Sequence, residues 1–124
     1  MSVKGLGTDI VEISRVASVS EGSERFAKRV LAESELDIYR QHMQPERYLA
    51  KRWAAKEAAA KALGTGIGRG VSFQNFIISN NELGAPKLQL VGKALEVANS
   101  MVVTSVLLSI SDEKHYATAT VILS

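Results

Sequence analysis

The segment "WAAKEAAAK", residues 53–61, lies within the longest helical pattern of the sequence. Pro45 suits the first turn of a helix and Gly64 suits a helix end, so we predict one long helix over residues 45–63. Alanine dominates residues 54–62, and its small side chain permits close approach of neighbouring elements on most sides. We therefore expect this helix to be closely packed by the rest of the chain.

The remaining elements follow from the spacing of apolar residues and from the turn residues between them. The predicted strands cover residues 3–13, 71–79, 87–91, 103–111 and 116–124, and the predicted shorter helices cover 23–32, 33–41 and 92–101. The last two strands form a hairpin around "DEKH". Because the helices come early and the strands late, the sequence predicts an α+β fold with helices packed on an antiparallel sheet.

Composition limits the class of protein. The 124 residues suit a single domain over 1–124, with 46% apolar residues, 23% charged residues and a net charge of +2. The absence of cysteine excludes disulfides, a thiol nucleophile and cysteine-based zinc sites. The N-terminal residues show neither a signal peptide nor a membrane span, so we expect a cytoplasmic protein without a membrane partner.

Three side chains of the long helix fall on one face. Trp53, Glu57 and Lys61 are spaced four residues apart, whereas Lys56 points about a quarter turn away. A solvated Glu57–Lys61 ion pair would explain the charges at a gain of only about 0.3–0.5 kcal/mol. The alanine-rich surroundings favour a functional role for these charged side chains instead. A row of charged residues on a closely packed helix seldom serves solubility alone.

A second candidate carboxylate, Asp9, stands among glycines and apolar residues of the first predicted strand. A lone buried carboxylate is costly unless it is paired or binds a cation, although Asp9 could also cap a turn or pair with a lysine. Two carboxylates from separate elements, with lysines nearby, are what a Mg²⁺–diphosphate site requires.

Other segments carry weaker signals. The glycine-rich segment 64–70 lacks the Gly-Lys-Ser/Thr of a P-loop and follows a helix, so it reads as a helix end, or as backbone that lets a bulky ligand approach. The basic residues between 15 and 29, with Phe26 among them, form either a solvated face or a docking surface for an acidic protein.

The two strongest segments together resemble a known family. Gly7, Asp9 and Arg15 match the pattern G-x-D-x-x-x-x-x-R, and "WAAKEAAAK" matches [FW]-x-x-K-E-x-x-x-K. These are the two signatures of the holo-acyl-carrier-protein synthase family, the short bacterial type of 4'-phosphopantetheinyl transferase. The order and separation of the motifs are similar to the family's, and "RFAKRVL" and "SISDEKHYATATVIL" extend the resemblance over essentially the whole chain.

The resemblance implies a reaction and a set of site residues. Phosphopantetheine would pass from coenzyme A to a serine of apo-acyl carrier protein, with release of adenosine 3',5'-bisphosphate. Asp9 and Glu57 would hold Mg²⁺, Lys61 would steady the phosphates, and Glu57 would help to deprotonate the serine, directly or through water. Family members of this type are homotrimers with active sites at subunit boundaries. The implied coenzyme A contacts are Arg52, Lys56, Lys61, Gly64 and His115, and the implied carrier-protein contacts are Arg15, Arg25, Phe26 and Arg29.

Two other functions compete with this interpretation. A non-catalytic coenzyme A or nucleotide-binding module would bind the cofactor without Mg²⁺-dependent turnover, but both carboxylates and the phosphate lysine are intact. An RNA-binding domain is disfavoured because aromatic residues make up only 6% of the chain and no aromatic–basic RNA-reading motif is present, so we expect no nucleic-acid partner.

Overall fold

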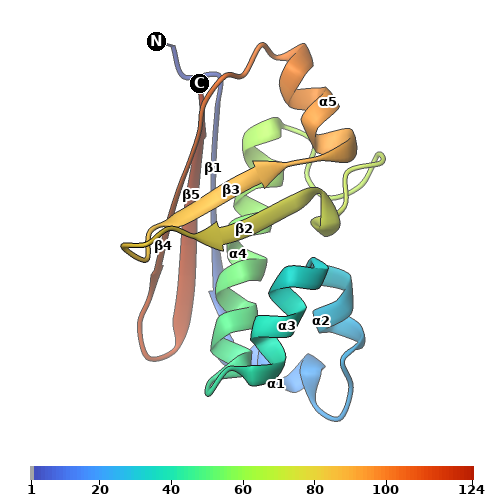
Figure 1. Cartoon of the computed structure of the whole chain (residues 1–124), viewed down its shortest axis with the longest axis vertical. Coiled ribbons are helices and arrows are strands. Elements are labelled where there is room, and N and C mark those ends of the chain that lie inside the picture. Colours follow the sequence, from blue (N-terminus) through green and yellow to red (C-terminus); the bar gives the residue numbers. More distant parts are fainter. Residues whose placement is uncertain (1) are drawn as a thin grey trace.

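The computed structural model describes residues 2–124 and shows an α+β fold (Figure 1). The antiparallel arrangement and the packing of helices on the sheet confirm the predicted fold class. No helix of the described residues has the length and apolar character needed to cross a membrane. In chain order the elements are β1 (Gly5–Glu12), α1 (Ile13–Ser20), α2 (Arg25–Val30), α3 (Glu33–Gln41), α4 (Pro45–Leu63), the 3-10 helix η1 (Phe73–Asn75), β2 (Phe76–Asn80), β3 (Pro86–Leu90), α5 (Gly92–Ser100), β4 (Val106–Asp112) and β5 (Tyr116–Leu123).

The long helix α4 is the central element, as predicted. It begins with Pro45 at its first turn and ends at Gly64, whose φ of 82° lies in the left-handed region that favours glycine. Most of its residues are buried, including all of its alanines, because β1 and β5 cover one side and the shorter helices and β2 lie on others. The alanines therefore do serve close packing.

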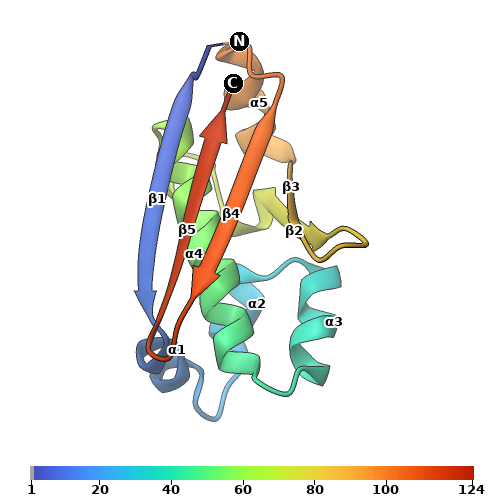
Figure 2. The same ribbon diagram turned by 90° about the vertical axis from the view of Figure 1, so that its left-hand side faces the viewer.

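One face of α4 is covered by a three-stranded antiparallel sheet with the order β1-β5-β4 (Figure 2). Alternate residues of β5, such as Ala119 and Val121, point inward and are buried. On the opposite face Leu6 of β1 is paired with Ile122 of β5, which is paired with Leu107 of β4. Leu6 and Leu107 are exposed, and Figure 2 shows no element in front of this face.

Two glycines bring β1 against the backbone of α4. A Cβ atom at Gly7 would lie 1.9 Å from the carbonyl oxygen of Ala58, and one at Gly5 would lie 2.1 Å from that of Ala62. Any larger residue would push the strand away from the helix. The glycines that interrupt the strand pattern are thus the residues that allow the strand to touch the helix.

Some elements differ from the sequence-based expectation. The helix α1 over residues 13–20 was not predicted, because its serine and valine residues are weak helix formers; it is held by burial of Val16. The strand predicted over 71–79 is a strand only from Phe76, since Asn75 accepts a hydrogen bond from the Ser72 N–H and closes a 3-10 turn. β2 and β3 also form a sheet of their own.

Candidate active site

The two motifs meet where β1 lies against α4. Lys61 Nζ donates hydrogen bonds to Asp9 Oδ1 at 2.9 Å and to the carbonyl oxygen of Thr8 at 3.0 Å. The Asp9 side chain is mostly buried, whereas that of Lys61 is about half exposed. The contact between Gly7 and Ala58 lies beside this pair and fixes how closely the strand approaches the helix. The predicted juxtaposition of Asp9 with this face of α4 is therefore present.

Glu57 lies one helical turn before Lys61 and is partly buried. Burial raises the pKa of its carboxyl group, and the negative charge of Asp9 raises it further; the Trp53 indole, Lys61 and Arg29 oppose the shift in part. Within residues 2–124 no basic side chain forms an ion pair with Glu57. Two neighbouring carboxylates, of which one has no counter-ion, form a site that a cation would stabilise.

The donor set fits a magnesium ion that also binds a phosphate group. Within the described residues no cluster of three or more His, Cys, Asp or Glu side chains could hold a metal by itself. Mg²⁺ commonly takes only one or two carboxylates from the protein and completes its shell with water and substrate phosphates. Asp9 and Glu57 match that pattern, and they do not match a structural site built wholly from protein ligands.

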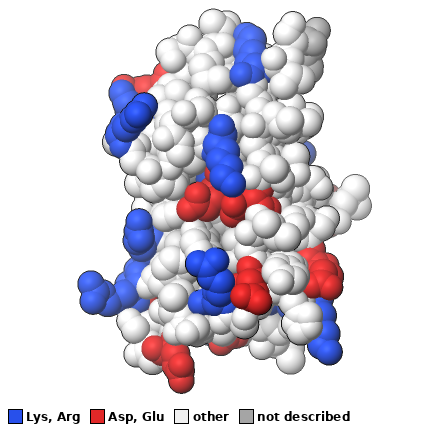
Figure 3. Space-filling model, turned by 180° about the vertical axis from the view of Figure 1, so that it is seen from behind, with Lys and Arg blue, Asp and Glu red and all other residues white. Residues whose placement is uncertain are grey.

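Acidic and basic side chains lie next to one another on the face of the molecule shown in Figure 3. A band of acidic side chains lies at mid-height, with basic side chains above and below it. An extended ligand that carries both phosphates and a cation could contact both kinds of charge on such a surface.

Lys56 does not lie where its predicted role requires. Its side chain is fully buried, and its Nζ donates to Glu35 Oε1 at 2.5 Å and to the carbonyl oxygen of Val30 at 2.7 Å. Burial lowers the pKa of Lys56, while the carboxylate of Glu35 opposes the shift. An ammonium without exposed surface cannot contact coenzyme A, so the expected contact of Lys56 is wrong and its role is structural.

Arg52 lies on the same side of α4 as Lys56 and is almost buried. Its guanidinium donates to Asn80 Oδ1 at 3.2 Å, lies 3.8 Å from Glu35 Oε2, and covers the ring of Tyr48 at 4.9 Å. It also lines a cavity of about 450 Å³ between α4 and the loop that joins β2 to β3. This cavity can receive a ligand, and Arg52 offers it a positive charge.

Sequence reasoning missed two further basic residues of this cavity, Arg47 and Lys51. Both form ion pairs with Asp112 of β4, at 2.9 Å and 3.5 Å. Burial raises the pKa of Asp112, but these two partners outweigh burial and hold the pKa below its ordinary value. One carboxylate thus balances two cations, and Glu35 is shared between Arg52 and Lys56, which leaves the cavity positive. The four-residue spacing of 47 and 51 was the available signal.

Gly64 and His115 lie near opposite ends of α4, so one chain does not bring them together. Gly64 caps the C-terminal end of the helix. His115 is exposed in the turn between β4 and β5, where its N–H donates to Glu113 Oε1 at 2.8 Å. Arg47 donates to the carbonyl oxygens of Glu113 and Lys114 in the same turn, which connects His115 to the basic cavity.

The predicted carrier-protein contacts lie on α1 and α2. Arg15, Arg25 and Arg29 are exposed, and within the described residues none of them forms an ion pair. Phe26 is partly buried and packs edge-on against Trp53, with ring centroids 5.0 Å apart. Because Trp53 lies one turn before Glu57, this contact places the basic helix α2 beside the candidate site.

A family model described as the 4'-phosphopantetheinyl transferase superfamily matches residues 5–121. The chain belongs to this superfamily. It is 60% identical to holo-[acyl-carrier-protein] synthase of Shewanella baltica (strain OS185) over 124 residues, which cover 99% of this chain and 98% of that protein. The resemblance noted in the sequence is thereby confirmed.

Solved structures of the superfamily share the whole fold. The crystal structure of holo-[acyl-carrier-protein] synthase from Neisseria meningitidis has a TM-score of 0.90 at 41% identity and covers 99% of both chains. The Helicobacter pylori synthase, solved in complex with coenzyme A, has a TM-score of 0.83 at 32% identity, covering 96% of this chain and 99% of that chain.

Proposed function

We propose that this chain transfers 4'-phosphopantetheine from coenzyme A to a serine of apo-acyl carrier protein, giving holo-acyl carrier protein and adenosine 3',5'-bisphosphate. The observation that carries the proposal is the meeting of Asp9, Glu57 and Lys61 at the contact between β1 and α4. The names of the relatives and the superfamily match support it. A non-catalytic coenzyme A-binding module is not favoured, because the acidic pair and the lysine are all present.

In this reaction the serine oxygen attacks the phosphorus atom that carries the pantetheine arm. A new P–O bond forms to serine, the diphosphate P–O bond breaks, and the electron pair of that bond leaves with adenosine 3',5'-bisphosphate. Glu57, whose pKa is raised, accepts the serine proton directly or through water. Lys61 neutralises charge on the diphosphate, so positioning and charge stabilisation supply most of the rate enhancement.

Asp9 and Glu57 would hold Mg²⁺ in this proposal. Held by these two carboxylates, Mg²⁺ would supply positive charge that neutralises the diphosphate. The unpaired carboxylate of Glu57 and its repulsion by Asp9 support this assignment.

The adenosine bisphosphate part of coenzyme A would bind in the basic cavity at Arg52, near the turn that holds His115. Gly64, at the other end of α4, would contact coenzyme A across a subunit boundary. The excess of positive charge over Asp112 and Glu35 supports a doubly phosphorylated ligand. Arg15, Arg25, Phe26 and Arg29 would dock the acidic carrier protein, since three of these residues are exposed cations without ion pairs within the described chain.

The chain would act as a homotrimer with its active sites at subunit boundaries. The uncovered row of Leu6, Ile122 and Leu107 on the outer sheet face supports association, because an apolar row of this kind gains from burial. The carboxylates and the basic cavity lie on different sides of α4, which also suits a site shared between subunits. A stable monomer in light scattering would contradict this arrangement. We further infer that residues 1–124 are a single transferase domain in the cytoplasm.

The test is mass spectrometry of apo-acyl carrier protein after incubation with this protein, coenzyme A and Mg²⁺. We expect a gain of one phosphopantetheine group, which EDTA, Asp9→Ala and Glu57→Ala each abolish. Binding of coenzyme A without a mass gain would favour the non-catalytic module. If coenzyme A does not bind and the carrier protein gains no mass, the proposed function is refuted.

A further inference from the structure

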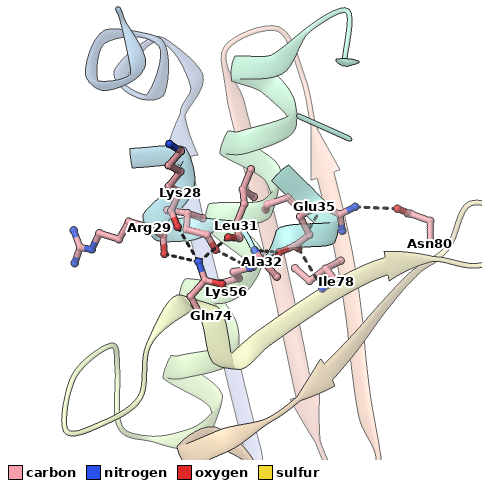
Figure 4. A network of polar contacts seen from close by, with 11 residues as sticks. Lys28, Arg29, Leu31, Ala32, Glu35, Lys56, Gln74, Ile78 and Asn80 are labelled. Atoms are coloured by element: carbon pink, nitrogen blue, oxygen red, sulfur yellow. Dashed lines mark hydrogen bonds and ion pairs between the residues drawn. The ribbon is translucent and has the colours of Figure 1, made fainter. Parts of the chain in front are cut away.

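Two side chains from other elements reach the C-terminal end of the basic helix α2. It has only six residues, Arg25–Val30, and a helix of this length is not stable by itself. Its last carbonyl groups lack partners within the helix and must find donors elsewhere. Those donors come from α4 and from η1, and both are drawn in Figure 4.

The donor from α4 is Lys56. Its Nζ reaches the carbonyl oxygen of Val30 and the carboxylate of Glu35, which in turn accepts the N–H of Ala32 at 2.7 Å and the N–H of Ile78 at 3.2 Å. A buried ion pair therefore ties the junction of α2 and α3 to α4 and to β2 (Figure 4). Lys56, the motif residue that precedes Glu57, thus acts on a different face of the helix, about a quarter turn away.

The donor from η1 is Gln74. Its Nε2 donates to the carbonyl oxygens of Lys28 at 2.8 Å and Leu31 at 2.6 Å, with a longer contact of 3.5 Å to that of Arg29. The guanidinium of Arg29 lies over the ring of the neighbouring Phe73, with its Cζ atom 5.5 Å from the ring centroid. Residues 73 and 74 therefore fix both the end of α2 and the direction of Arg29.

We propose that Gln74 is a positioning residue that, together with Lys56, sets the docking helix α2 at a fixed place relative to Glu57. The inference rests on the proposed function, in which Arg25, Phe26 and Arg29 receive the carrier protein. The distance over which it acts is short, because Phe26 packs on Trp53, one turn from Glu57.

The test compares Gln74→Met with Gln89→Met. Both glutamines are exposed, and Gln89 of β3 makes no side-chain hydrogen bond within the described residues. Methionine keeps the length of glutamine but removes its amide donor. We expect Gln74→Met to raise the KM for apo-acyl carrier protein roughly fivefold, the factor that one hydrogen bond contributes. The KM for coenzyme A, kcat and the control variant should stay unchanged.

Amide hydrogen exchange separates positioning from direct contact of Gln74 with the carrier protein. We expect faster exchange at the amides of residues 28–31 in Gln74→Met and not in Gln89→Met. A raised KM for the carrier protein without faster exchange would overturn the positioning role. Equal increases in the KM for the carrier protein and the KM for coenzyme A would also overturn it, and so would a lower Tm with both KM values unchanged. If the wild-type protein transfers nothing, the proposed function fails. Calorimetric binding of the carrier protein then still tests the inference. Equal affinity of wild type and Gln74→Met, or no binding by either, overturns it.

Discussion

The ammonium group of Lys61 lies 2.9 Å from Oδ1 of Asp9, across the contact between α4 and β1. The same carboxylate is a proposed ligand of Mg²⁺, so Lys61 would compete with the cation for it. When a diphosphate binds, Lys61 can turn from Asp9 to the phosphate oxygens, because its side chain is about half exposed. The lysine would then serve as the counter-ion of Asp9 before coenzyme A binds and as a phosphate ligand afterwards.

Replacement of this lysine should change metal binding and catalysis in opposite directions. In the absence of coenzyme A, Lys61→Met should bind Mn²⁺ a few-fold more tightly than wild type, because Asp9 loses its competing cation. The transfer rate should fall roughly 100-fold or more, because a charge-stabilising group is lost. Electron paramagnetic resonance of free Mn²⁺ measures the affinity. Lys93→Met, at an exposed lysine paired with Glu96, is the matched control. Weaker Mn²⁺ binding by Lys61→Met would contradict the competition.

Glu57→Gln should abolish transfer and stabilise the protein at neutral pH. Burial and Asp9 raise the folded-state pKa of Glu57 above its ordinary value of 4.5, so the ionised form destabilises the folded protein. This penalty is complete above the raised pKa and disappears as the pH falls through it to the unfolded value. The neutral variant should therefore gain roughly 1–3 °C in Tm at pH 7 and lose that gain in acid.

Calorimetric Tm values over a pH series test this expectation. Glu96→Gln changes an exposed glutamate in the same way and should leave Tm unaltered. A lower Tm for Glu57→Gln at neutral pH would mean that the carboxylate stabilises the fold.

Gly7→Ala should lower the free energy of unfolding by at least about 2 kcal/mol. The added Cβ atom would lie 1.9 Å from the carbonyl oxygen of Ala58, so the strand would have to move. Activity should fall with it, because Asp9 moves with the strand. Gly22→Ala is the comparison: Gly22 has a φ of 70° but open space around it, so its cost should be about 1 kcal/mol. Urea denaturation measures both, and equal costs would refute the close-contact argument.

Lys56→Met should be strongly destabilising because it leaves the buried carboxylate of Glu35 without its closest cation. The expected loss is about 3–5 kcal/mol, the usual effect of breaking a buried ion pair. Adding Glu35→Gln should recover part of that loss, since it removes the unpaired buried charge and its amide oxygen can still accept the N–H of Ala32. A double-mutant cycle from urea denaturation measures the coupling. Strictly additive losses would show that the two charges do not depend on each other.

Sequence alone predicted the elements whose signals are local. Pro45 and Gly64 mark both ends of α4, and alternation identifies the last hairpin. Asp9 and Glu57 were chosen as candidates from the alanine-rich and glycine-rich segments around them, and the family resemblance joined them into one predicted site. The helix α1 was missed because burial of Val16, a tertiary contact, stabilises a segment of low helix propensity.

The remaining errors concern which side of an element a residue faces and what it meets there. The motif gives Lys56 no orientation, and Glu35 looks like a solvated residue of an acidic helix although it is fully buried. Likewise, nothing in the local sequence joins Arg47 and Lys51 of α4 to Asp112 of β4. Those pairings exist only once distant segments are folded together.

The contact of β1 with α4 through Gly5 and Gly7 has a consequence for protein engineering. The separation between the strand and the helix is set by main-chain atoms, which substitution of surface residues does not change. Variation in α1 and α2 could therefore adapt the enzyme to a different carrier protein while the reacting groups keep their places. Recognition and chemistry could be redesigned one at a time.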